Sequence, residues 1–99
     1  MPYSVEWKPG AAEDITELFE YIAEHSGLWD AQHVTARLID AADRLAEFPR
    51  LYGVDARYGD DVRRLSLVGQ HLLYEVDDPA QTVRVLAVVG QRQNPLPLR

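Results

Sequence analysis

The sequence predicts an α+β fold, in which a helical hairpin packs on a small antiparallel sheet in the chain order β-α-α-β-β-β. Two observations support this fold class. Apolar residues recur at helical spacing between residues 15 and 48, and they alternate with polar residues in short runs before and after that stretch. A chain of 99 residues can bury one modest core, so we expect a single domain over residues 1–99.

The first strand is predicted at the start of the chain. Tyr3, Val5 and Trp7 alternate with polar residues, as they would in a strand with one buried face. Pro9 and Gly10 interrupt the alternation, so we expect the strand to end before them.

Two amphipathic helices are predicted next. The apolar side of the first helix is formed by Ile15, Leu18, Phe19 and Ile22. That of the second is formed by Val34, Leu38, Ala41, Leu45 and Phe48. Glu13 and Asp14 are expected in the first turn of the first helix, where carboxylates suit the helix dipole. Gly27 is expected to end this helix, Asp30 to cap the second and Pro49 to close it.

Residues 49–61 show no sustained period, which predicts a loop, and three strands follow. Two alternating runs, residues 62–68 and 71–76, flank Gly69-Gln70, which we predict to be a two-residue hairpin turn. This turn would place Arg64 opposite Glu75, Ser66 opposite Leu73, and Val68 opposite His71. On the core face it would pair Leu65 with Tyr74 and Leu67 with Leu72. The last run, residues 82–89, is the most apolar and is expected at the centre of the sheet.

The charge of the chain is unevenly distributed. The net charge is −6, which argues against general affinity for nucleic acids, because phosphate binding depends on clustered Lys and Arg. Residues 1–49 carry three cations against ten carboxylates, whereas residues 50–99 carry seven arginines against six carboxylates. We therefore expect any cationic surface to belong to the second half.

Several kinds of site are not indicated by the sequence. There is no cysteine, so neither a disulfide framework nor a thiolate metal site is expected. His25 and His33 lack metal-ligand spacing on one element, and no glycine-rich phosphate loop occurs, so we expect neither a metal nor another cofactor. No apolar run is long enough to span a membrane and no leader pattern opens the chain, which predicts a cytoplasmic protein.

Three basic or titratable residues can converge on the polar face of the sheet. Arg64 and His71 share that face in the predicted hairpin, and Arg92 follows the last strand in the segment VGQRQNP. One interpretation is a site that holds phosphate or an acidic partner, with His71 moving a proton near neutral pH. The other is structural: Glu75 neutralises Arg64, His71 flanks a turn, and Arg92 is solvated. Composition does not choose between them.

The ordered set of segments resembles a known family. The runs YSVEWKPGAAEDITELFEYIAE, LAEFPRLYG, VRRLSL, HLLYEVDD and VRVLAVVGQRQ, spread over about residues 3–93, are similar to the RelE/ParE superfamily of bacterial type II toxins. The resemblance implies a helical hairpin on a small antiparallel sheet. It also implies a toxin that a cognate antitoxin protein, encoded beside it, keeps inactive.

Two mechanisms compete within this superfamily. RelE-like members are ribosome-dependent messenger-RNA endonucleases, and the resemblance places Arg64, His71 and Arg92 at their basic positions. Val62 stands where a second basic residue would be, His71 replaces an arginine, and Leu98 stands near an expected tyrosine. The ribonuclease set is therefore incomplete, and electrostatic stabilisation is usually the largest catalytic term.

ParE-like members inhibit DNA gyrase by binding it, and the segments YIAE and FPRLYG look more like that branch. We favour this interpretation, with Arg63, Arg64, His71 and Arg92 as contacts to the antitoxin or the target and no catalytic residue. The expected partners are the antitoxin and gyrase, or alternatively the ribosome and messenger RNA, without a membrane or direct DNA binding by the toxin alone. A third interpretation is a non-toxic relative that binds only its antitoxin.

Overall fold

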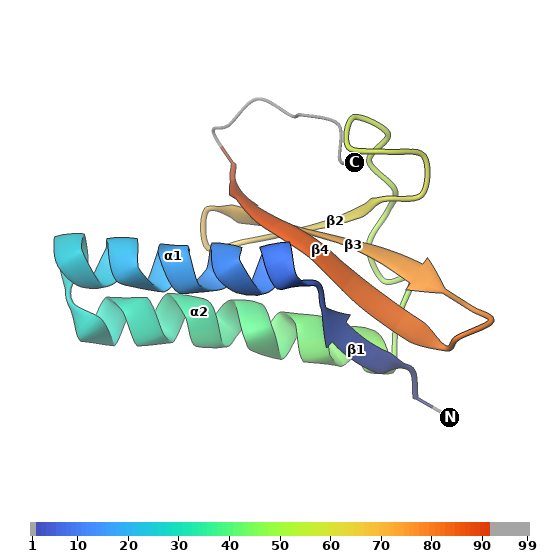
Figure 1. Cartoon of the computed structure of the whole chain (residues 1–99), viewed down its shortest axis with the longest axis horizontal. Coiled ribbons are helices and arrows are strands. Elements are labelled where there is room, and N and C mark those ends of the chain that lie inside the picture. Colours follow the sequence, from blue (N-terminus) through green and yellow to red (C-terminus); the bar gives the residue numbers. More distant parts are fainter. Residues whose placement is uncertain (1, 92–99) are drawn as a thin grey trace.

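The structure, a computed structural model, describes residues 2–91 and confirms the predicted α+β fold class (Figure 1). Its elements follow in the order β1 (Ser4–Trp7), α1 (Pro9–Ser26), α2 (Leu28–Asp43), the 3-10 turn η1 (Arg44–Ala46), β2 (Arg63–Leu67), β3 (Gln70–Asp77) and β4 (Thr82–Gly90). The strand order in the sheet is β1-β4-β3-β2, so β4 is central, as its apolar sequence predicted. The prediction of a wholly antiparallel sheet was wrong in one detail, because β1 pairs with β4 in parallel.

The two helices form the predicted hairpin, but three details of their ends differ from the prediction. Helix α1 begins directly at Pro9, whose fixed φ suits the first helical position, so Glu13 and Asp14 lie beyond the first turn. Gly27 has φ of 101° and is both the C-cap of α1 and the N-cap of α2, which leaves Asp30 inside the first turn of α2. The α-helix ends at Asp43 and continues as η1, well before Pro49.

The main core lies between the helical hairpin and one face of the sheet. Its fully buried members include Leu38 and Leu45 from the helical segment and Leu65, Leu72, Tyr74, Val83 and Val85 from the strands. Tyr3, Val5 and Trp7 pack against this cluster, as their alternation predicted. Phe48 was wrongly assigned to the apolar side of the second helix, because the chain leaves the helix before it and its side chain is 58% exposed.

The β2–β3 hairpin differs from the predicted register by two residues. Ser66 lies opposite His71 and Arg64 lies opposite Leu73, so the turn is Val68-Gly69 and the predicted pairs were wrong. Both turn residues have positive φ, 48° and 80°, which a type I′ hairpin turn requires. A shift by two residues leaves every side chain on its original face, because side chains alternate with a period of two. The predicted division into core and polar faces therefore still holds for this hairpin.

The second face of the sheet carries a smaller apolar cluster. Tyr58, from the loop before β2, packs there with Val62, Leu73 and Ala87. The same loop joins the sheet edge through an isolated bridge between Val54 and Arg63 and a backbone hydrogen bond from Asp55 to Val62. This loop therefore covers part of the face that carries Arg64 and His71.

Helix α1 also supports the end of β4. Strand β1 pairs with β4 only as far as Val85, and the backbone N–H of Val88 is therefore left without a strand partner on that side. The Oδ2 atom of Asp14 accepts a hydrogen bond from this N–H at 3.0 Å. A carboxylate of the helix thus takes over where the strand pairing stops.

Candidate functional site

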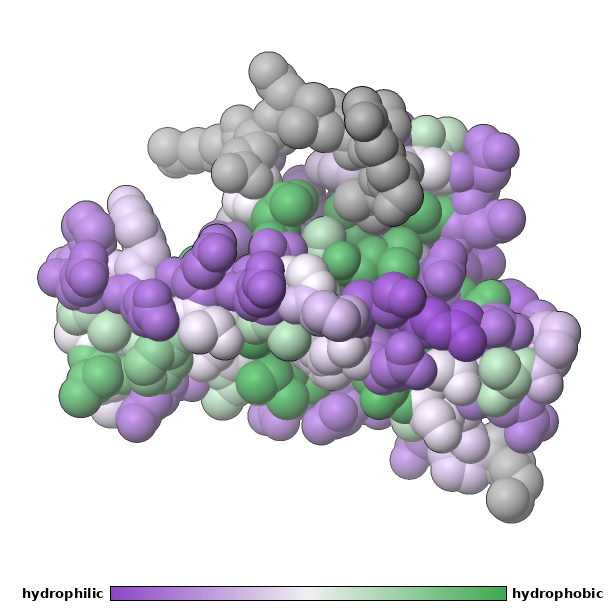
Figure 2. All heavy atoms as spheres, viewed as in Figure 1, coloured by the Kyte–Doolittle hydropathy of each residue, from purple (hydrophilic) through white to green (hydrophobic). Residues whose placement is uncertain are grey.

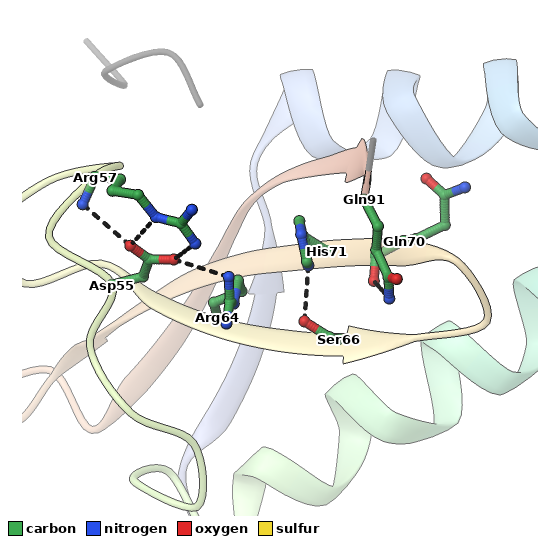
Figure 3. A network of polar contacts seen from close by, with 7 residues as sticks. All are labelled: Asp55, Arg57, Arg64, Ser66, Gln70, His71 and Gln91. Carbon is green, nitrogen blue, oxygen red and sulfur yellow. Dashed lines mark hydrogen bonds and ion pairs between the residues drawn. The ribbon is translucent and has the colours of Figure 1, made fainter. Parts of the chain in front are cut away.

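The candidate site lies where the loop before β2 crosses the second face of the sheet (Figure 3). Asp55 is at its centre, with only 12% of its side chain exposed. Its carboxylate accepts hydrogen bonds from Nε and Nη2 of Arg57, at 2.9 and 2.7 Å. The Nη1 atom of Arg64, on β2, lies 3.1 Å from Oδ2 of the same carboxylate. One carboxylate therefore holds two guanidinium groups side by side.

Asp55 is ionised throughout the neutral range. The hydrogen bonds from the Arg57 side chain, more than any other contact, lower the pKa of Asp55 to about 2. Arg57 also lies over the ring of Tyr58, with its guanidinium carbon 6.0 Å from the ring centroid. Together Asp55, Arg57 and Arg64 carry a net charge of +1, so the cluster still attracts an anion, but less than two free arginines would.

His71 lies further along the same face, on β3. Its Nδ1 atom shares a hydrogen bond with Oγ of Ser66 at 2.7 Å, directly across the hairpin. Partial burial, followed by the positive charges of Arg64 and Arg57, lowers the pKa of His71 below its usual value of 6.5. The imidazole is therefore neutral at pH 7, a form that can accept a proton.

Arg63 points to the opposite face from Arg64, as its neighbouring position in the strand requires. Its Nη1 atom donates a hydrogen bond to the backbone oxygen of Tyr52 at 2.7 Å. It lines a charged cleft of about 400 Å³ together with Arg50, Arg84 and four carboxylates. Arg50 pairs with Asp78 and Arg84 pairs with Asp77, so most of the charge in this cleft is balanced internally.

The structure thus brings together two of the four predicted site residues, Arg64 and His71. Arg63 lies on the other face, and Arg92 lies outside the described residues. Glu75, proposed as the partner of Arg64 in the structural interpretation, instead lies opposite Arg84 of β4, and Asp55 takes its place beside Arg64. Within residues 2–91, no group of three or more His, Asp or Glu side chains is arranged to hold a metal ion.

Asp55 and Arg57 were not predicted as site residues. They lie in a loop without periodicity, where sequence alone gives no register from which to place a side chain. The only available signal was the spacing of a carboxylate and an arginine two residues apart, which suits a local turn in which each can reach the other. The backbone N–H of Arg57 does donate to Oδ1 of Asp55 at 3.1 Å.

Two helices packed on a four-stranded sheet form the fold that the resemblance to RelE/ParE-type toxins implied. A search of protein-family models gives a match over residues 5–95 to the ParE toxin of type II toxin-antitoxin systems, parDE. Because the match spans nearly the whole chain, the chain belongs to this family and is the toxin component of a type II toxin-antitoxin system. A search of curated protein sequences gives no match.

Solved structures of both branches share the fold. The chromosomal ParDE system from Pseudomonas aeruginosa contains a chain that is 16% identical, with a TM-score of 0.77 over 89% of this chain and 95% of that one. A chain of the RelBE2 complex from Mycobacterium tuberculosis is 24% identical, with a TM-score of 0.68 over 92% of this chain and 100% of that one. A chain of the intact Escherichia coli RelBE complex is 19% identical, with a TM-score of 0.69 over 92% of this chain and 99% of that one. These identities establish the fold and do not choose between the branches.

None of the helices within residues 2–91 is long and apolar enough to cross a membrane.

Proposed function

We propose that this toxin acts in the cytoplasm by binding DNA gyrase and inhibiting it, and that a cognate antitoxin protein neutralises it. The observation that carries the proposal is the family match to ParE over residues 5–95. The net charge of −6 agrees with a target bound through protein surfaces, since an enzyme that grips RNA needs a broad cationic footprint.

The geometry of the sheet face also weighs against messenger-RNA cleavage. Val62, at a position where RelE-like members carry a basic residue, is 7% exposed and packs in the smaller apolar cluster. Arg64 is engaged by Asp55, so a scissile phosphate would have to compete with a carboxylate already in place. Both features remove positive charge from the position where a phosphate-transfer transition state would need it.

One observation favours the ribonuclease as a second candidate. Neutral His71 can act as a general base on a ribose 2′-hydroxyl, and Ser66 holds its ring in a fixed orientation. Arg57 and Arg64 lie on the same face, where they can stabilise charge on a phosphate. We therefore retain ribosome-dependent cleavage of messenger RNA as the alternative, with Arg64, His71 and Arg92 in the catalytic roles.

The antitoxin is proposed to bind the cationic part of the chain. A segment of a protein partner can add a strand to a sheet or lay an amphipathic helix in a groove, using apolar anchors and complementary charges, and we expect the antitoxin to bind in one of these ways. Arg63, Arg64 and Arg92 would supply the charged contacts, and the neutral imidazole of His71 would supply a polar one. The chain of the P. aeruginosa ParDE system and that of the E. coli RelBE complex both come from toxin-antitoxin systems, which supports a protein partner of this kind.

The target is tested by inducing the toxin without its antitoxin and measuring DNA supercoiling and protein synthesis in the same cells. We expect relaxed or broken DNA while translation continues, and inhibition of purified gyrase by the purified toxin. Messenger RNA cut in phase with codons on ribosomes, together with active gyrase, would instead establish the alternative. Normal growth, with a stable complex between toxin and antitoxin, would identify a non-toxic antitoxin-binding relative.

A further inference from the structure

The helical hairpin carries a large uncompensated negative charge. Residues 9–43 contain eight carboxylates and one arginine, a net charge of −7, whereas the remainder of the chain sums to +1. All four ion pairs within residues 2–91 use Asp55, Asp77 or Asp78, and none of them uses a carboxylate of α1 or α2. Asp14 is bound to the backbone of β4, but the other helical carboxylates are free to meet a partner.

A shallow apolar groove of about 430 Å³ runs between the helices on this acidic surface. It is lined by Ile15, Thr16, Phe19 and Glu20 from α1 and by Thr35 and Ile39 from α2. Leu28, 63% exposed at the tip of the hairpin, lies seven residues before Thr35 and so on the same side of α2. Figure 2 shows hydrophobic atoms along the seam between the two helices and at the free end of the hairpin, beside a hydrophilic stripe on α1. We call these seven residues the hairpin groove.

We propose that the hairpin groove is the surface with which the toxin binds its target, and that it takes a cationic segment of the target protein carrying apolar anchor residues. This inference rests on the proposed function as a protein-binding inhibitor. The apolar residues of the groove supply the area that anchors a partner, and the surrounding glutamates select lysine and arginine on it. The antitoxin would then bind the cationic second half of the toxin, and the target would bind its acidic helical hairpin.

The same charge argues against the other occupants of such a groove. A second copy of this chain, packed groove to groove, would bring together two helical hairpins whose residues 9–43 each carry a net charge of −7. An RNA or DNA backbone would be repelled for the same reason. Complementarity therefore points to a cationic protein segment.

The test uses the full-length toxin and measures gyrase affinity, growth arrest and antitoxin affinity for four variants. Glu17→Gln with Glu20→Gln removes one charge in the groove, at Glu20, and one next to it on the surface of α1, at Glu17. Glu47→Gln with Asp60→Asn removes two exposed carboxylates elsewhere. Leu28→Gln changes an exposed leucine of the groove, and Leu51→Gln changes one that is 55% exposed outside it. All six substitutions in these four variants replace exposed side chains, so the fold is expected to persist, and thermal unfolding verifies it.

We expect each groove variant to lower gyrase affinity about tenfold and to weaken growth arrest, with antitoxin affinity unchanged. The two control variants should behave as the wild type. Added salt should weaken wild-type binding to gyrase more than binding of the Glu17→Gln, Glu20→Gln variant.

The outcomes separate the inference from the proposed function. Unchanged gyrase affinity and growth arrest in both groove variants would overturn the inference while leaving gyrase as the target. Growth arrest without gyrase binding, abolished by the groove variants but not by the controls, would overturn the gyrase proposal and support the groove as the docking surface for another target. A wild-type chain that neither arrests growth nor binds gyrase would overturn both.

Discussion

Ser66 and His71 face each other across the β2–β3 hairpin, with Oγ of the serine 2.7 Å from Nδ1 of the histidine. This contact exists because the turn is Val68-Gly69, which brings these two residues into register. His71 is consequently held on the sheet face near Arg64 and does not flank the tip of the turn. Ser66 therefore orients the ring of His71, while burial and the charges of Arg64, Arg57 and Asp55 determine its pKa.

The first prediction concerns the pKa of His71. Partial burial is the main cause that lowers it below 6.5, the charges of Arg64 and Arg57 lower it further, and Asp55 opposes them. Arg64→Gln should therefore raise this pKa while leaving it below 6.5, and Asp55→Asn should lower it. NMR titration of the ring protons measures both shifts.

A His71 that titrates at 6.5 in the wild type and in both variants would contradict the electrostatic description of the site. The lowered pKa of His71 also determines how this residue changes the stability of the fold with pH. The unfolded chain binds a proton first as pH falls, so His71 reduces stability below about pH 6.5.

The second prediction concerns acid stability. Asp55 has a pKa of about 2 in the folded protein, against a usual value of 3.8. Its ionised form thus stabilises the fold above about pH 4, and this contribution is lost as pH falls through about 2. After allowing for screening by solvent, we expect about 1 kcal/mol. Urea unfolding at pH 2.5 and pH 6 should show that Asp55→Asn destabilises the protein at pH 6 and has a smaller effect at pH 2.5. An equal loss of stability at pH 2.5 and at pH 6 would show that the charge of the Asp55 carboxylate does not stabilise the fold.

The fold class was predictable because its signals are local and repeated. Helical spacing identified α1 and α2, alternation identified the strands, and the apolar character of residues 82–89 placed β4 at the centre. The hairpin register was not predictable in the same way. Choosing Val68-Gly69 over Gly69-Gln70 requires a β-branched residue to adopt φ of 48°, which the local preferences of valine disfavour. In the observed register Leu65 lies opposite Leu72, and both side chains are fully buried in the main core.

The candidate site was only half predictable for a related reason. Arg64 and His71 lie on strands, where the period of two assigns each side chain to a face. Asp55 and Arg57 lie in a loop, and their positions depend on tertiary contacts such as the packing of Tyr58 against Leu73. Sequence reasoning could therefore assign Arg64 a face but could not name its partner.

The third prediction concerns backbone strain at Gln81, which has φ of 49° in the turn between β3 and β4. Its side chain is exposed and makes no hydrogen bond within residues 2–91. Gln81→Gly should stabilise the protein by ~0.5–1 kcal/mol, because glycine adopts this conformation without a Cβ clash. Gln81→Val, which is β-branched, should destabilise it. Chemical denaturation measures both, and a gain in stability from the valine variant would show that the turn relaxes instead of being strained.

The last prediction concerns the contact between Asp14 and the backbone of Val88. The carboxylate accepts the N–H of Val88 at 3.0 Å, beyond the point where β1 stops pairing with β4. Asp14→Ala would leave this part-buried donor without its acceptor, and an unmade hydrogen bond of this kind costs ~1–3 kcal/mol. We expect a loss in that range by urea unfolding, together with faster amide hydrogen exchange at Val88. Asp14→Asn retains a side-chain acceptor and should lose less. Glu13→Gln, at an exposed position next to it, should change the stability by less than ~0.5 kcal/mol. If Asp14→Ala were as neutral as Glu13→Gln and exchange at Val88 were unchanged, another acceptor would have to support this end of β4.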